Sequence, residues 1–276
     1  MKNLIAYFSI EHDTHRIFLL LFSIFIFWNI ENIIAITTNY KKWKHALTNS
    51  LFVFTAAPVQ LLLGFILVKT IHWESVHHFG LLFMLPQLSH PMAQLIFAFI
   101  FLDFFEYVYH VIMHKVKRLW MFHLVHHSDR VVDVSTTLRE HPGETFVRLS
   151  FSTVWVLLLG APFWIILFHQ FFQIAANVFV HSNFRLSNKW DKVAGLIFIT
   201  PNLHHVHHHY QQPYTDSNYG DILSIWDRLF GTFSTLKINE TTFGIDNYME
   251  EKENTDFKNL VKIPFGKYRP VGSREQ

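Results

Sequence analysis

The stretch QLIFAFIFLDFFEYVYHVIMH, Gln94–His114, decides both the fold and the chemistry expected of this 276-residue chain. It is apolar over the ~20 residues that a helix needs to cross the hydrocarbon of a bilayer. It also carries Asp103, His110 and His114, which lie on one stripe of a helix. The stretch is therefore predicted to be a membrane helix with ionisable side chains along one face.

Other apolar segments indicate an all-α integral membrane protein. Ile17–Ile36 and Leu51–Val68 are each long enough for one crossing. Thr153–Val180 is too long for one crossing and contains Gly160-Ala161-Pro162, so we expect a short helical hairpin that turns there. The predicted fold has about three transmembrane helices plus this hairpin, with a cytoplasmic helical cap. The aromatic segment Ile71–His90 is expected to be a loop at the outer interface of the bilayer.

Composition supports this reading and excludes several classes of protein. The chain is 50% apolar and 16% charged, against roughly 25% charged in globular proteins. It has no cysteine, which excludes disulfide-built modules and cysteine-ligated zinc or iron–sulfur sites. A net charge of +2 provides no basic field for nucleic acid. A soluble all-α bundle is the alternative fold, and the separate apolar spans weigh against it.

Histidine is the unusual residue of this sequence, with 20 copies, ten of them in two short windows. Groups spaced HxxxH once and HxxHH twice place their imidazoles on one face of a helix. They supply eight candidate metal ligands, His110, His114, His123, His126, His127, His204, His207 and His208, while His181 stands alone in the sequence. Buried polar groups without partners cost roughly a few kcal/mol each, so the set requires a shared partner. A metal fits, because neutral imidazole is the commonest metal ligand.

The number of imidazoles indicates more than one metal ion. A structural zinc takes four ligands and a catalytic zinc takes three plus water, so eight or nine nitrogens exceed one site. They suit two ions a few Å apart. Imidazole binds iron, copper, zinc and nickel, so spacing alone does not name the element. The two Glu-x-x-His motifs of soluble di-iron bundles are missing as a pair, because the spacing occurs only once in the sequence.

Several segments together resemble the fatty acid hydroxylase/sterol desaturase superfamily, including its sterol desaturase and alkylglycerol monooxygenase-like members. They are DFFEYVYHVIMH (Asp103–His114), LWMFHLVHHS (Leu119–Ser128), His181, TPNLHHVHH (Thr200–His208) and NYGDILSIWDRLFGTF (Asn218–Phe233). The resemblance implies a non-haem di-iron membrane enzyme in which the histidines of the three groups ligate iron and His181 is the ninth ligand. Val111 is a departure, because the family often has arginine there. His205 and His209 are expected to be neighbours of the site.

The resemblance also implies an activity. Two iron ions would activate O2 for hydroxylation or desaturation of an unactivated C–H bond, and hydroxylation is favoured. The substrate would be a lipid or sterol-like molecule entering from the membrane lipids. A separate redox partner would supply electrons, because the chain has no GxGxxG fingerprint. A membrane zinc hydrolase of a lipid amide or ester and a metal-binding or transport protein are the alternatives.

Residues outside the histidine groups receive supporting roles. Asp103 is expected to be a catalytic residue that orients a ligand histidine, and an interhelical hydrogen bond is the alternative. Glu106 is a weaker candidate because it lies on another stripe. The segment 139–142 is expected to close the site, with His141 a weak ligand candidate. The 218–227 region is expected to form a turn and a helix that pack under the histidines.

Lysine and arginine predict the orientation in the membrane. With the spans above, Lys2, Arg16 and Lys69 fall on one side and the other 20 of the 23 basic residues on the opposite side. Basic residues concentrate in cytoplasmic loops, so all the histidine groups are expected on the cytoplasmic side. The N-terminus lacks the basic start and cleavage site of a removable signal peptide. We expect a multi-pass protein of a bacterial inner membrane.

The chain divides into three parts by composition. Residues 1–92 are expected to hold the N-terminal membrane helices, and 93–236 the catalytic domain. Residues 237–276 are polar and charged and are expected to form a loosely packed tail.

Overall fold

The computed structural model describes residues 5–7, 12–237 and 240–272, which are helical apart from connecting segments and two isolated β-bridges. The prediction of an all-α membrane protein is confirmed, because four described helical segments are long and apolar enough to cross a membrane. They are Ile17–Ile34, Lys42–Met84, Pro91–Lys115 and Phe163–Val180. The prediction that no signal peptide is present depends partly on residues 1–4 and 8–11, which lie outside the described residues.

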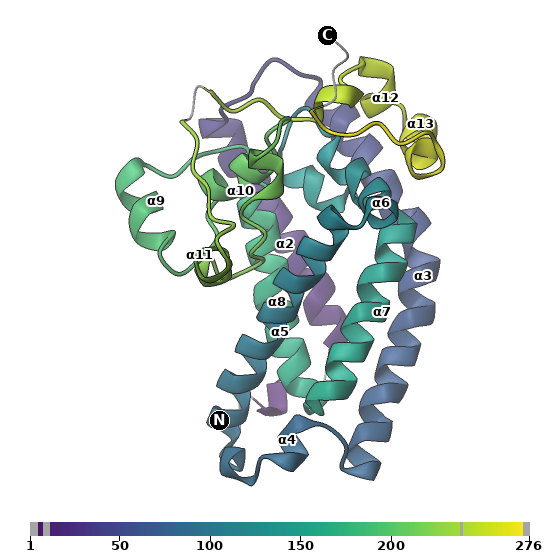
Figure 1. The fold of residues 1–276 in the computed structure, drawn as a ribbon, viewed down its shortest axis with the longest axis vertical. Coiled ribbons are helices and arrows are strands. Elements are labelled where there is room, and N and C mark those ends of the chain that lie inside the picture. The colour runs from purple at the N-terminus through teal and green to yellow at the C-terminus, as the bar shows by residue number, and fades with distance from the viewer. Residues whose placement is uncertain (1–4, 8–11, 238–239, 273–276) are drawn as a thin grey trace.

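Long helices form an elongated bundle, and most of the short helices gather at one end of it (Figure 1). The long helices are α2 (His12–Ile34), α3 (Lys42–His77), α5 (Pro91–Lys115), α7 (Pro142–Leu159) and α8 (Phe163–Val180). The gathered short helices are α6 (Lys117–His127), α9 (Asn188–Ala194), α10 (Pro201–His207), α11 (Ile225–Phe230), α12 (Glu251–Thr255) and α13 (Phe257–Lys262). Single 3-10 turns are η2 (Val134–Leu138), η3 (Tyr214–Asp216), η5 (Asp246–Tyr248) and η6 (Ile263–Phe265). The opposite end carries α4 (Leu81–Met84) and η1 (Pro86–Leu88).

Helix α3 is much longer than the predicted crossing at Leu51–Val68, and the predicted loop at Ile71–His90 is wrong. The helix has 36 residues and continues to His77, followed by α4 and η1. Its length of about 54 Å exceeds the ~30 Å hydrocarbon of a bilayer. The hydropathy pattern stops early because polar residues enter it. The helix continues nonetheless, and Ile71 packs in an apolar cluster with residues of α5, α7 and α8.

The predicted hairpin turns where expected, between α7 and α8, at Gly160-Ala161-Pro162. Its first arm begins at Pro142, earlier than the expected Thr153, and its second arm ends at Val180 as expected, with 18 residues in each helix. Gly160 and Gly80 have φ angles of 66° and 117°, in the region that favours glycine. A Cβ on Gly80 would lie 2.5 Å from the Cα of Gly160. The hairpin therefore reaches the segment after α3, at the end of the bundle opposite α6 and α10.

The C-terminal segment is packed, so the prediction of a loosely packed tail is wrong for its described residues. Leu260 of α13 is fully buried in an apolar cluster with Leu124 of α6 and Phe52 of α3. The buried Arg139 guanidinium donates to the carbonyl of Asn254 at 3.0 Å. Scattered apolar residues among many charges conceal this packing in the sequence.

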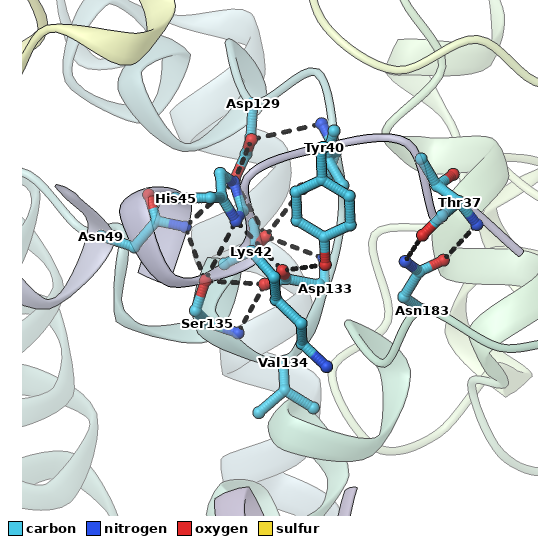
Figure 2. A network of polar contacts seen from close by, with 12 residues as sticks. Thr37, Tyr40, Lys42, His45, Asn49, Asp129, Asp133, Val134, Ser135 and Asn183 are labelled. Atoms are coloured by element: carbon cyan, nitrogen blue, oxygen red, sulfur yellow. Dashed lines mark hydrogen bonds and ion pairs between the residues drawn. The ribbon is translucent and has the colours of Figure 1, made fainter. Parts of the chain in front are cut away.

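A buried polar network fixes the start of α3 against the segment that follows α6 (Figure 2). The His45 imidazole lies between two carboxylates, with Nε2 2.8 Å from Asp129 Oδ1 and Nδ1 3.0 Å from Asp133 Oδ2. The Tyr40 hydroxyl donates to Asp133 at 2.6 Å. Burial raises the pKa of Asp129, but the charges of His45 and Arg139 outweigh it and hold this pKa below its usual value. The network thereby anchors the chain directly after the last histidine of α6.

Candidate metal centre

Four separate segments bring the predicted histidines to one end of the bundle. Helix α5 carries His110 and His114 in its last turns, and α6 follows after a single residue. His181 is the residue directly after α8. Helix α10 begins at Pro201, and the Thr200 hydroxyl caps it by accepting from the Leu203 backbone at 3.2 Å. Segments far apart in the sequence thus meet where these helices end.

All nine predicted ligand histidines fall into two compact sets. Within each set, one ring nitrogen per residue lies within 4.8 Å of the others. The first set is His110, His114, His123, His127 and His207. The second set is His126, His181, His204 and His208. The arrangement offers two neighbouring sites of five and four nitrogens.

Each HxxHH group contributes histidines to both sets, so its spacing serves to divide the imidazoles between two sites. Helix α6 supplies His123 and His127 to the first set and His126 to the second. The second group does the reverse: His207 of α10 belongs to the first set, and His204 of α10 and His208, directly after the helix, belong to the second. The sets touch, because the ring centroids of His127 and His208 are 4.5 Å apart. Two sites built this way are close enough to act together.

The spacing of the nitrogens fits a metal within each set. In the first set, His123 Nε2 lies 3.1 Å from His110 Nε2 and 3.2 Å from His127 Nε2. In the second, His181 Nε2 lies 3.0 Å from His126 Nε2 and 2.9 Å from His204 Nε2. Nitrogens bound ~2.1 Å from one ion at right angles lie ~3.0 Å apart. Both sets therefore have the separations expected of ligands that share an ion.

Hydrogen bonds on the far side of several rings fix which nitrogen faces inward. The partners are carbonyl or carboxylate oxygens: Tyr219 for His110 at 2.9 Å, Asp216 for His114 at 3.3 Å, Glu144 for His123 at 2.6 Å, Asn177 for His181 at 2.8 Å and Ser217 for His207 at 2.7 Å. In every case Nδ1 makes this bond and can donate its proton to the oxygen. The lone pair of Nε2 is then left for a metal.

Electrostatics keep these imidazoles uncharged. Burial lowers the pKa of His123 to about 3 and that of His181 to about 4. Burial, followed by repulsion among neighbouring imidazoles, holds the pKa of further ligand candidates well below the usual value; these are His126, His127, His204, His207 and His208. The Nε2 atoms of His114 and His207 are buried without a hydrogen-bond partner among the described residues. Neutral rings with unsatisfied nitrogens fit a pair of metal ions.

Other predicted site residues lie outside both sets. Asp103 accepts from Trp226 Nε1 at 2.7 Å and from the Ile222 backbone at 3.1 Å, and no histidine is among its described hydrogen-bond partners. The structure therefore gives Asp103 the interhelical hydrogen bond and not the orientation of a ligand. His141 caps α7 by accepting from the Gly143 backbone at 2.9 Å. His209 accepts from the Thr242 backbone at 3.2 Å.

The 218–227 turn holds one of the oxygens that orient the rings. Asp227 accepts from the backbone of Tyr219 at 2.7 Å and of Gly220 at 2.9 Å. These bonds fix the Tyr219 carbonyl against His110. The 218–227 segment thus packs against the histidines, as the sequence predicts.

Sequence reasoning missed the carboxylates that touch the rings. Glu144 is buried in the first turn of α7, and Asp216 ends η3. The one available signal for Glu144 is a carboxylate at the edge of an apolar segment. Backbone carbonyls such as those of Tyr219 and Ser217 leave no signal in a sequence.

Comparisons with known proteins agree with this geometry. The fatty acid hydroxylase family matches residues 95–232, which contain all nine histidines. The chain is 33% identical to ornithine lipid hydroxylase OlsE of Rhizobium tropici over 144 residues, which are 52% of the chain and 43% of that protein. It is 31% identical to human alkylglycerol monooxygenase over 136 residues, which are 49% of the chain and 29% of that protein.

A more distant relative is human cholesterol 25-hydroxylase, 26% identical over 155 residues, which are 55% of the chain and 56% of that protein. The matched part thus covers about half or less of each of these relatives. No solved structure matches the chain. The family match extends over half of the chain and includes every segment that builds the two histidine sets, so this chain belongs to the fatty acid hydroxylase family.

Proposed function

We propose that the chain is a di-iron oxygenase that uses O2 to hydroxylate an unactivated C–H bond of a membrane lipid. The observation that carries the proposal is the pair of adjoining sets of five and four neutral imidazoles. Membership of the family supports an oxidoreductase, and three relatives are named as hydroxylases or monooxygenases of lipids or a sterol. The balanced reaction is RH + O2 + 2e⁻ + 2H⁺ → ROH + H₂O. A separate redox partner would supply the two electrons.

The nine histidines would hold the two iron ions, which supply the redox chemistry of O2 when bound. The chain contributes position and charge. Neutral ligands leave the ions electrophilic, and Glu144 holds the Nδ1 proton of His123 so that this ring keeps one orientation. The spans would bring the site to the edge of the bilayer, where an apolar chain would reach it without crossing water.

We infer from the distribution of lysine and arginine that the site faces the cytoplasm. Both ends of the 142–180 hairpin lie beside α6 and α10, so the histidine groups occupy one end of the bundle (Figure 1). The same arrangement would place the site where a cytoplasmic redox partner reaches it. A bacterial inner membrane is the proposed location.

Metal analysis of the purified protein tests the proposal. We expect two irons per chain, O2 uptake on reduction and one ¹⁸O atom in the lipid product from ¹⁸O₂. One zinc per chain with no O2 uptake would refute the oxygenase and favour a zinc hydrolase. His126→Ala and His207→Ala, one in each set, should abolish activity and lower bound iron, whereas the matched control His209→Ala should retain both.

A further inference from the structure

Polar side chains continue from the candidate metal centre into the level of the membrane spans. Glu106 of α5 lies one turn before His110, about 6 Å along the helix axis. The Ser152 hydroxyl of α7 lies 3.5 Å from Glu106 Oε1. Gln173 of α8 lies beside both Glu106 and Asp221, and the two carboxylates interact with each other. We call Glu106, Ser152, Gln173 and Asp221 the polar subsite.

The polar subsite has more carboxyl groups than cations around it. Arg148 is the cation next to both carboxylates. Its guanidinium, however, makes a two-pronged contact with Glu140, with Nε 3.1 Å and Nη2 3.0 Å from the two oxygens. Arg148 is thus shared among three carboxyl groups, those of Glu140, Glu106 and Asp221. Burial disfavours the charged form of a carboxyl group, and a positive group bound next to it favours that form.

Two buried polar atoms at this level also lack partners. Asp221 Oδ2 has no hydrogen-bond partner among the described residues. The Tyr109 hydroxyl lies on the next turn of α5 from Glu106, is 6% exposed and interacts electrostatically with Glu106 and Arg148. It too has no hydrogen-bond partner among the described residues. Buried groups of this kind are normally satisfied, so they point to a bound polar molecule.

An apolar cavity lies beyond the polar subsite, further from the histidines. It has a volume of about 350 Å³ and is lined by Phe101 and Phe105 of α5, Leu158 of α7 and residues around α4. Along α5 the order is therefore cavity, Glu106 and His110. Along α7 it is Leu158, Ser152 and then Glu144, which contacts His123. A molecule that spans these regions has an apolar tail and a polar group next to the metal centre.

We propose that Glu106 and Asp221 bind a protonated amine of the lipid substrate, close to the carbon that reacts. The inference rests on the proposed function, because it assigns the substrate class of the same site. A singly charged ammonium group offsets negative charge on the two carboxylates, which a neutral hydroxyl group does not. It also donates hydrogen bonds to oxygens that have no donor, such as Asp221 Oδ2. Tyr109 can accept a further bond from the same group. The apolar cavity takes the tail.

Matched probes test the charge of the ligand. Octadecylamine and octadecanol share one chain and differ in the terminal group, so their affinities for the purified holoenzyme in detergent isolate the amine. We expect the amine to bind at least about tenfold more tightly than the alcohol. Glu106→Gln, Asp221→Asn and the double variant should each reduce this preference. Glu74→Gln changes a buried carboxylate near the C-terminal end of α3 and should preserve the preference for the amine.

The result that overturns the inference is equal affinity for the two probes, or a preference that survives in both single variants. The single variants carry the test if the double variant does not fold. Bound iron should be unchanged in all of them, because neither carboxylate contacts a ligand histidine among the described hydrogen bonds. A wild-type protein that prefers the amine but holds no iron would refute the proposed function and still support the polar subsite.

Discussion

Glu144→Ala is the substitution that tests most directly how the rings are held. The carboxylate oxygen lies 2.6 Å from His123 Nδ1, and both side chains are nearly buried, with 6% and 8% exposed. The contact is short and shielded from water, so its loss leaves the buried Nδ1–H of His123 without an acceptor. Removing it frees the His123 ring to rotate and removes the group that raises its basicity.

The expected cost is a 10- to 100-fold loss of metal affinity, as for comparable outer partners of metal-ligating histidines. That range corresponds to about 1.4–2.7 kcal/mol. Asp216→Ala should cost less, because its oxygen is 3.3 Å from His114 Nδ1 and its side chain is 20% exposed. Glu144→Gln should lie between wild type and Glu144→Ala, since the amide oxygen still accepts the hydrogen bond without its charge.

Competition with a chelator, followed by iron analysis of the protein, gives the apparent affinity of each variant. Circular dichroism and thermal unfolding show whether the fold is intact, and Glu74→Gln serves as the control for loss of a buried carboxylate. Wild-type resistance to the chelator in Glu144→Ala would refute the reasoning. So would a greater loss in Asp216→Ala than in Glu144→Ala.

The remaining predictions concern the packing around the site, measured by thermal or denaturant unfolding in detergent. Arg139→Met removes four buried hydrogen-bond contacts and should lower the free energy of unfolding by about 3–5 kcal/mol, whereas the exposed Arg118→Met should have little effect. Leu260→Ala should cost about 2–5 kcal/mol if the C-terminal segment is part of the core, and no loss of stability would contradict that packing. Gly160→Ala should destabilise by more than Gly231→Ala, because both have positive φ but only Gly160 has backbone against it.

Features that are set by residues close together in the chain can be predicted from the sequence. Apolar length predicts the membrane helices, and Gly160 and Pro162 predict the turn between α7 and α8. Histidine spacing predicts eight residues and the family resemblance adds His181, and the structure assembles all nine into two sets. The spacing does not predict that HxxHH divides its rings between two sites, because that depends on how α6 and α10 face each other.

Features that depend on distant partners escape the sequence. Helix α3 extends past its apolar run, where Ile71 packs against residues of α5, α7 and α8. Asp103 looks like a site residue, yet its oxygens are taken by Trp226 and Ile222, which lie in a later segment. Leu260 lies in a polar, charged segment of the sequence, and its burial depends on contacts with α3 and α6. In each case the partner that decides the role is remote in the chain.

The division of both sets among early and late segments has a consequence for biosynthesis. His127 leaves the ribosome 77 residues before His204, an interval of about 4–15 seconds at ordinary rates of translation. Throughout this interval neither set is complete, yet His110, His114, His123 and His127 already provide four nitrogens. Copper and zinc bind nitrogen donors more tightly than ferrous iron does, so the nascent chain is exposed to mismetallation. For the proposed metal centre, the ion that the mature protein carries would then depend on the supply of metals while it is being made.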